Sequence, residues 1–258
     1  MNGVAKTKQD GFHLIALAIL VIVAGAIGLA AWKVLTKKDA PKLATASSQQ
    51  LEVTKPGETA CPAQPMMSSP ADVSLATAVL YPGQTRGSDY KAHGGLRFDG
   101  SQDNKVTVRA PMDAKLTIGS RYIEQGEVQI LLEFSNDCGV KYRFDHLLTL
   151  SDKFQKAVDG SLPAAKPDDS RTSDFKPAID VKKGEVVATA VGFAKTGNVG
   201  FDFGVYDTRQ QNGITKANNN LASYGVCWLK DWLPATDLAI LVALPGGDSK
   251  NGKTSDYC

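Results

Sequence analysis

The chain has 258 residues, of which 43% are hydrophobic, and a formal net charge of +2. This length allows one sizeable domain with appendages, and the apolar content is sufficient for a core. The small charge, with no basic stripe interleaved with aromatic residues, argues against a nucleic-acid-binding surface.

The first feature along the chain is an uncharged run from Leu14 to Trp32, with lysines on both sides. At about 1.5 Å per helical residue, a run of this length matches the thickness of a bilayer core. We therefore expect a short tail at 1–10 and a single transmembrane helix at 11–33. The alternative is a cleaved signal peptide, for which the Ala-Gly-Ala at 24–26 is an acceptable cleavage site.

The orientation of this predicted anchor rests on two opposing signals. Lysines are denser after the apolar run, which favours a cytoplasmic C-terminal side, but long domains translocate largely regardless of that bias. Four cysteines in a domain of this size suit an oxidising compartment. We therefore expect a single-pass protein of the cell membrane with an extracytoplasmic C-terminal domain.

The next segment has the composition of a tether. From Lys33 to Leu80 there is no aromatic residue, and five of the twelve prolines lie here. Such a segment buries too little apolar surface to offset its ordering entropy, so residues 34–71 are expected to be a disordered tether. Cys61 is the exception, because a bond from it would fix the end of the tether to the folded body.

Beyond the tether, short apolar or alternating runs are separated by turn residues. They include "KVTVRA", "AKLTIG", "EVQILLEF", "KYRFDHLLTL", "GEVVATAVGF" and "VGFDFGVYD". Runs of four to eight residues bounded by Gly, Asn, Asp and Pro indicate β-strands. Residues 151–180 are rich in Pro and Asp and indicate an inserted loop or short helix. The predicted domain at 72–209 is mainly β, a curved antiparallel sheet or sandwich.

The order of these pieces carries a resemblance. The segments "AHGGLRFD", "VTVRAPMDAKL", "KYRFDHLLTLS" and "GFDFGVYD" resemble, over Tyr81–Asp207, the lysostaphin-type (LytM-like) peptidoglycan endopeptidases. The resemblance implies an antiparallel β fold and a zinc enzyme. In that family a histidine, an aspartate four residues later and the second histidine of a late His-x-His pair bind the zinc.

The positions that match these ligands have mostly changed. His93 matches the first ligand, but Arg97 stands at the aspartate position. The late pair falls on Gly200 and Asp202, or with a one-residue slip on Val199 and Phe201. The resemblance therefore supplies only one of the three zinc ligands.

A second matching position concerns catalysis. His146, preceded by Asp145, matches a histidine that assists catalysis in the family, so His146 is the candidate for a catalytic relic. The Gly-x-Ser-x-Gly motif, the phosphate-binding loop and other alternative catalytic patterns are not found in the sequence.

Zinc in such sites needs three protein donors and one open position for water. A guanidinium group has no lone pair to donate, so Arg97 cannot be a ligand. We therefore expect no bound zinc. The alternative is a site built from His93, Asp99 and Asp202, because residues two apart on a strand share a face.

We expect Arg97 to occupy the place of the metal, in contact with Asp202 or Asp99 and close to His93. The predicted groove is lined by His93, Arg97, Asp99, Asp145, His146 and Asp202.

The C-terminal part, 210–258, lies beyond the resemblance. Apolar residues recur at near-helical spacing after Pro234, which predicts a short helix with Thr236 as its cap. The chain ends in a cysteine. Four cysteines allow three pairings, and we expect Cys227–Cys258 and Cys61–Cys138.

Two functional classes follow. The first, which we favour, is a non-catalytic, peptidase-like pseudoenzyme that binds cell-wall peptidoglycan or a wall-enzyme partner, because inactive relatives in the resembled family act by binding and activating other wall enzymes. It needs no cofactor. The second is an atypical zinc metalloendopeptidase that cleaves peptidoglycan cross-bridges. Fold alone does not decide between them.

Overall fold

The computed structural model describes residues 61–62, 65–214, 221–230 and 232–258. The predicted tail at 1–10, the transmembrane helix at 11–33 and most of the tether lie outside the described residues. Among the residues that are described, none of the helices has the length and apolar character needed to span a bilayer.

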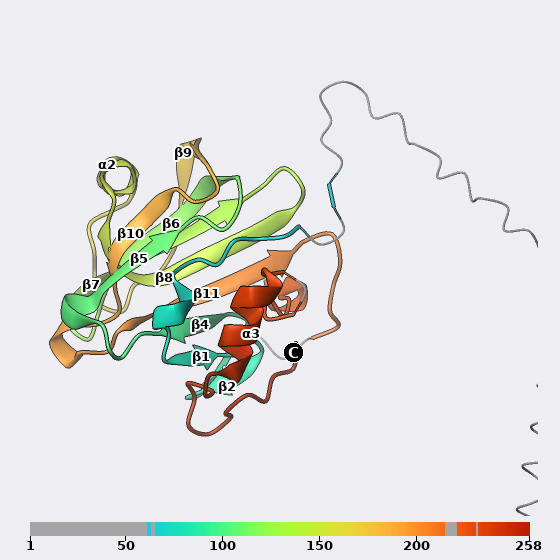
Figure 1. The fold of residues 1–258 in the computed structure, drawn as a ribbon. Helices are drawn as coiled ribbons and strands as arrows, with labels where there is room; N and C mark the ends of the chain where they lie inside the picture. The colour runs from blue at the N-terminus through green and yellow to red at the C-terminus, as the bar shows by residue number, and fades with distance from the viewer. Residues whose placement is uncertain (1–60, 63–64, 215–220, 231) are drawn as a thin grey trace, which may run out of the picture. The chain divides into compact units, whose positions relative to one another are not determined.

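The described chain is built on one antiparallel sheet of nine strands, with the order β1-β4-β11-β8-β7-β6-β9 and with β10 bridging β5 and β8 (Figure 1). A separate hairpin joins β2 and β3. The strands are β1 (Ala78–Leu80), β2 (Gln84–Arg86), β3 (Asp89–Lys91), β4 (Gly94–Arg97), β5 (Lys105–Arg109), β6 (Ala114–Glu124), β7 (Glu127–Ser135), β8 (Val140–Leu150), β9 (Ser173–Val181), β10 (Val186–Val191) and β11 (Gly200–Asp207). The predicted mainly β, antiparallel fold is confirmed.

Helical elements are few and short in the described residues. They are the 3-10 helices η1 (Val73–Leu75), η2 (Gln102–Asn104), η3 (Ala194–Thr196) and η4 (Ala222–Tyr224) and the α-helices α2 (Asp152–Ser161) and α3 (Ala235–Ala243). The prediction of a loop or short helix over 151–180 is right for α2 and wrong for β9. Because β9 is an edge strand that contains Pro177 and buries Phe175 on one side, its hydrophobic alternation is weak.

The long central hairpin is explained by its turn. Glu124 pairs with Glu127, and the two residues between them, Gln125 and Gly126, both have positive φ (49° and 74°). Two-residue turns of this kind match the right-handed twist of antiparallel strands. The turn therefore fixes the register of β6 against β7.

The core lies on one face of the sheet and is rich in aromatic rings. Phe144 on β8 stacks on Phe203 on β11 with ring centroids 5.3 Å apart, and Trp228 meets Phe203 edge-on at 5.1 Å. Trp228 belongs to the C-terminal part of the chain and is fully buried. The segment beyond residue 210 therefore completes the same core.

The folded domain begins before residue 72, where it was predicted to start. Met67 is fully buried and its N–H donates to the Trp232 carbonyl, so packing begins upstream of residue 72.

Helix α3 follows Pro234 as expected, but Pro234 itself is the N-cap residue. Thr236 lies inside the first turn, and its hydroxyl donates to Asp237 rather than capping the helix.

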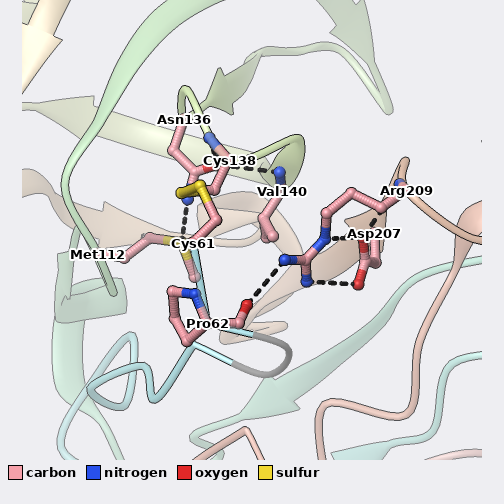
Figure 2. The surroundings of a disulfide bond; sticks show 8 residues. All are labelled: Cys61, Pro62, Met112, Asn136, Cys138, Val140, Asp207 and Arg209. Atoms are coloured by element: carbon pink, nitrogen blue, oxygen red, sulfur yellow. Dashed lines mark hydrogen bonds and ion pairs between the residues drawn. A yellow bond between two sulfur atoms is a disulfide. The ribbon is translucent and has the colours of Figure 1, made fainter. Parts of the chain in front are cut away.

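The two expected disulfides, Cys61–Cys138 and Cys227–Cys258, are present. Figure 2 shows the first, which joins the start of the described chain to the β7–β8 turn. Asn136 organises that turn by accepting from the backbone N–H groups of Cys138 and Val140. Arg209 donates to the Pro62 carbonyl at 2.7 Å, so the incoming segment is held by a covalent and a polar contact.

Candidate functional site

A cluster of polar side chains lies on the face of β8 and β11 opposite the aromatic core. This polar cluster consists of His93, Asp145, His146 and Asp202. Asp202 on β11 is in register with Asp145 on β8 and with Gly95 on β4. Its neighbours Phe201 and Phe203 are buried in the core, so alternation directs Asp202 to the other face. Two of the predicted site residues, Asp145 and Asp202, are thus brought side by side.

The closest contact in this cluster joins His93, just before β4, to Asp202. Nε2 of His93 lies 2.8 Å from Oδ2 of Asp202, and the two side chains are only 8% and 17% exposed. Burial on its own would raise the pKa of the Asp202 carboxyl, but the hydrogen bond from His93 and the positive charge of Arg86 hold that pKa well below its usual range. Asp202 is therefore ionised at neutral pH.

His93 is held in its neutral form by its surroundings. Burial lowers the pKa of His93 despite the opposing attraction of Asp202, and Arg143 and Arg86 lower it further. A neutral imidazole can still donate its Nε2–H to the Asp202 carboxylate. The pair is therefore a hydrogen bond from a neutral histidine to a carboxylate.

Two glycines make this contact sterically possible. A Cβ on Gly95 would lie 2.5 Å from the Phe201 carbonyl oxygen and 3.2 Å from Oδ1 of Asp202. A Cβ on Gly204 would lie 2.9 Å from Cβ of His93 and 2.6 Å from the Tyr206 hydroxyl. A side chain at Gly204 would collide with Tyr206 and His93, and one at Gly95 would collide with the backbone of β11 next to Asp202.

His146 reaches the cluster through an irregularity in β8. The register between β7 and β8 shifts between the pairs Ile130–Leu147 and Leu132–Phe144, which places one extra residue in β8. His146 lies in this bulge with a φ of 62°, a region that non-glycine residues rarely adopt. Bulges of this kind redirect a side chain, and strained residues concentrate at functional sites.

The imidazole of His146 contacts several partners. Its Nδ1 lies 3.3 Å from Oε1 of Gln129, and its ring packs 4.9 Å from that of Phe193. Its Nε2 lies 3.9 Å from Oδ2 of Asp202, the oxygen that also faces His93. Two imidazoles therefore converge on one carboxylate oxygen.

Asp145 is held by donors of the protein itself. Tyr122 on β6 donates to its Oδ1 at 2.7 Å, and the backbone N–H of His146 donates to the same oxygen at 2.9 Å. Nη2 of Arg143 lies 3.5 Å from the other oxygen. Burial, with Asp145 alongside, raises the pKa of Tyr122 well above its usual range, so its hydroxyl remains a donor.

The guanidinium group beside Asp202 is that of Arg86, a residue outside the predicted groove. Its Nη2 lies 3.9 Å from Oδ1 of Asp202, and its Nη1 donates to the carbonyls of Tyr81 and His93. Arg86 ends β2 in the turn-rich stretch "GQTRGSDY", and no spacing rule connects it to the later aspartate. Only the contact of the β2–β3 hairpin with the sheet reveals it.

Arg97, the predicted replacement for the metal, contacts Asp99, one of its two predicted partners, and not Asp202. Its Nη2 lies 2.7 Å from Oδ1 of Asp99, and Thr77 donates to the other Asp99 oxygen. These two charged side chains are 32% and 50% exposed. The structure thus separates the predicted groove residues into a buried cluster around Asp202 and an exposed Arg97–Asp99 pair.

The donor set does not fit the three-ligand zinc site of the resembled family. His93 and Asp202 are turned toward each other at hydrogen-bond distance, and Asp99 of the alternative set is engaged with Arg97 and Thr77. In the described part of the chain, no group of three or more His, Cys, Asp or Glu side chains is arranged to hold a metal ion. Two guanidinium groups, those of Arg86 and Arg143, also lie within reach of the cluster carboxylates.

Three buried polar atoms in and around the cluster have no hydrogen-bond partner among the described residues. They are Nδ1 of His93, Nε of Arg143 and the hydroxyl of Tyr206. Burial raises the pKa of Tyr206 to about 12 despite the opposing charge of Arg143. Because unpaired buried polar atoms are costly, the arrangement is held by the surrounding fold.

A pocket of about 360 Å³ lies elsewhere, between β6 and the segment that leads into β9. Its charged lining includes Arg121, Asp169 and Arg171, but these are already engaged. Arg121 bonds to Asp159 and two backbone carbonyls, and Arg171 forms a two-pronged pair with Asp169. None of its lining residues belongs to the cluster.

Comparisons with known proteins give little further guidance. No family model and no curated protein matches the chain. Among solved structures, the chain is similar to Helicobacter pylori Csd3 from an orthorhombic crystal, with a TM-score of 0.34 and 13% identity. The match covers 56% of this chain and 32% of that one, so the chain spans about a third of that protein's length. Likeness at this level assigns no family.

Proposed function

We propose that the protein is a membrane-anchored, extracytoplasmic module with a lysostaphin-like peptidase fold that does not catalyse hydrolysis. In this proposal it binds cell-wall peptidoglycan or a wall-enzyme partner through the polar cluster of His93, Asp145, His146 and Asp202. The sequence resemblance supplies the class of ligand. The geometry of the cluster supplies the argument against catalysis.

The observation that carries the proposal is the engagement of both cluster carboxylates by donors of the protein. Asp202 accepts from His93 and faces Arg86, while Asp145 accepts from Tyr122 and the His146 backbone. Carboxylate lone pairs used in this way are not available to a metal, and nearby guanidinium charges oppose a second cation. His146 and Asp202, with side chains 20% and 17% exposed, are the members of the cluster that a polar peptide or glycan would reach.

A second candidate is an atypical zinc endopeptidase. Its support is the convergence of His93 and His146 on Oδ2 of Asp202, with Nε2 atoms 2.8 Å and 3.9 Å from that oxygen. Two imidazoles and a carboxylate are the types of ligand that zinc accepts. Rotation of the His93–Asp202 pair away from direct contact would be required first.

The experiment that separates the two uses the purified full-length chain. Insoluble peptidoglycan is incubated with the protein, and three quantities are measured: the protein retained on the wall, the wall peptides released, and the zinc content of the protein. We expect retention without release and without stoichiometric zinc.

Matched variants connect the binding to the cluster. Asp202→Asn removes the charge that the cluster is built around, and should reduce retention on the wall at least several-fold. Asp99→Asn makes the same chemical change in the exposed Arg97–Asp99 pair and should leave retention unchanged. Zinc bound at one per chain, with peptide release that a chelator abolishes, would instead establish the endopeptidase. Equal retention of both variants would disconnect wall binding from the cluster.

A further inference from the structure

Gln129 on β7 presents a hydrogen-bond acceptor to the ring of His146. The Gln129 side chain is fully buried, so both ends of its amide need hydrogen-bond partners. Its Nε2 donates to the Gly192 carbonyl at 3.1 Å, and its Oε1 lies 3.3 Å from Nδ1 of His146. The reverse orientation of the amide would place Oε1 against a carbonyl oxygen, which cannot donate. The oxygen of Gln129 therefore faces His146.

This contact settles the tautomer of a neutral His146. An amide oxygen is only an acceptor, so Nδ1 of His146 must carry the hydrogen. The carboxylate of Glu124, with Oε2 4.0 Å from the same nitrogen, favours the same tautomer. The other ring nitrogen, Nε2, then keeps its lone pair. His93 has the opposite arrangement, because its Nε2 donates to Asp202.

The lone pair of His146 lies beside a second acceptor. Nε2 of His146 makes no hydrogen bond within the described part of the chain, and it is not one of the buried unpaired polar atoms, so solvent reaches it. It lies 3.9 Å from Oδ2 of Asp202, which is beyond hydrogen-bond distance. That oxygen accepts one hydrogen bond, from His93, and a carboxylate oxygen can accept a second. Two partly exposed acceptors thus lie side by side.

The spacing of the two acceptors indicates the chemistry of a ligand. One nitrogen that carries two hydrogens can lie about 2.9 Å from each of two acceptors that are 3.9 Å apart. A hydroxyl or a secondary amide carries one hydrogen, whereas a primary amide or an ammonium group carries at least two. The guanidinium groups of Arg86 and Arg143, which lie 3.9 Å and 3.5 Å from carboxylate oxygens of the cluster, disfavour the cationic ammonium. A neutral primary amide fits both conditions.

We propose that Nε2 of His146 and Oδ2 of Asp202 form a subsite that receives the NH2 group of a primary amide, and that Gln129 is the positioning residue that keeps Nε2 free of hydrogen. This inference rests on the proposed function, since it names the group of the cell-wall peptide that the polar cluster would bind. Gln129 acts only through the tautomer of His146, because its own polar atoms are taken up by Gly192 and His146.

The first test reads the tautomer in the full-length chain, held in detergent micelles at neutral pH and labelled with 15N in its three histidines. We expect the NMR spectrum to show hydrogen on Nδ1 and none on Nε2 of His146, and the reverse for His93. His93→Gln removes one set of signals and so assigns the spectrum. Hydrogen on Nε2 of His146 would overturn the proposal.

A matched pair of variants tests the role of Gln129. Gln129→Leu removes the acceptor that holds the hydrogen on Nδ1, and should increase several-fold the share of His146 with hydrogen on Nε2. Gln155→Leu makes the same change on α2, where Gln155 donates to Asp159, and should leave the His146 signals unchanged. An unaltered tautomer in Gln129→Leu would refute the positioning role. If that variant does not fold, the wild-type spectrum and the ligand probes decide.

The second test uses N-acetylalanine amide as the probe. N-acetylalanine dimethylamide, which lacks the two terminal N–H groups, is the control, and N-acetylethylenediamine supplies an ammonium group. We expect the primary amide to shift the Nε2 signal of His146 in a saturable manner, with an affinity at least several-fold above that of the other two probes. Equal affinity of the amide and the dimethylamide, or tighter binding of the ammonium probe, would overturn the proposal.

Competition on insoluble peptidoglycan separates this proposal from the proposed function. The primary amide should release the retained full-length chain from the wall, and the dimethylamide should not. Retention that neither probe disturbs would overturn the subsite and leave wall binding intact. Absence of retention, with the preference for the primary amide preserved at His146, would overturn wall binding and leave the subsite.

Discussion

His93 donates its Nε2–H to Oδ2 of Asp202 at 2.8 Å in a site that is almost closed to solvent. The sequence resemblance predicted a role for His93 in metal binding, and in the structure its Nε2 faces a carboxylate. The hydrogen bond joins a residue just before β4 to the middle of β11, two strands that are neighbours in the sheet. The contact therefore stabilises the fold and defines the cluster at the same time.

The free energy of unfolding should depend strongly on Asp202. Asp202→Asn keeps the size of the side chain but removes the charge that accepts from His93 and faces Arg86, and should lower the free energy of unfolding by about 1–3 kcal/mol. Asp99→Asn removes the same charge from an exposed pair and should cost less than about 1 kcal/mol. Urea denaturation of the two variants measures the difference. Equal losses would show that the Asp202 contact is no stronger than a surface pair.

Stability should also decrease in mild acid because of His93. Burial lowers the pKa of His93 in the folded protein, whereas the unfolded chain protonates near its ordinary value of about 6.5. Below that pH the unfolded state binds more protons, so the free energy of unfolding falls as the pH falls. The contribution is fully present above pH 6.5 and is lost toward the folded pKa.

His93→Gln tests this assignment, because glutamine retains an N–H donor for Asp202 and does not titrate. Between pH 7 and pH 5, the free energy of unfolding of the wild type should fall more steeply than that of the variant, by up to about 1.4 kcal/mol per pH unit. Parallel pH profiles would assign the acid sensitivity to other groups.

The bulge at His146 predicts an unusual pair of variants. His146→Ala and His146→Gly remove the same contacts to Gln129 and Asp202, but only glycine adopts a φ of 62° without strain. His146→Gly should therefore be more stable than His146→Ala by about 1 kcal/mol, measured by urea denaturation. In an ordinary strand the order would be reversed.

The two disulfides should contribute unequally. In the loop-entropy model, Cys61–Cys138, with a sequence separation of 77, contributes about 4.5 kcal/mol, and Cys227–Cys258, with a separation of 31, about 3.7 kcal/mol. Replacing each pair by serine and comparing thermal unfolding measures these values. Peptide mass spectrometry of the unreduced protein checks the pairing, and a linked peptide containing Cys61 and Cys227 would contradict it.

Much of the fold follows from local sequence patterns. Strand β5, "KVTVR", alternates exposed and buried residues as the period of two requires, and the turn at Gln125 and Gly126 closes a hairpin whose two strands were both predicted. Strand β9 was missed because an edge strand with Pro177 and few buried residues leaves little periodic signal.

The site is harder to predict from local sequence patterns, because its contacts join strands that are far apart in the sequence. Asp202 and His93 were selected from the resemblance, yet Arg86 and Tyr122 come from elements that no motif marks. We predicted that Arg97 would contact Asp202 or Asp99. The contact with Asp99 forms, but the guanidinium group beside Asp202 belongs to Arg86.

The Cys61–Cys138 bond also determines how the domain bears mechanical load. Force between an anchored N-terminal chain and a ligand held at the polar cluster would pass directly from Cys61 to Cys138. From there it would enter β8, the strand that carries Asp145 and His146 and that is bonded on both sides by β7 and β11. Residues 62–137 lie outside this covalent path, so tension would bypass half of the sheet and reach the ligand along its central strand.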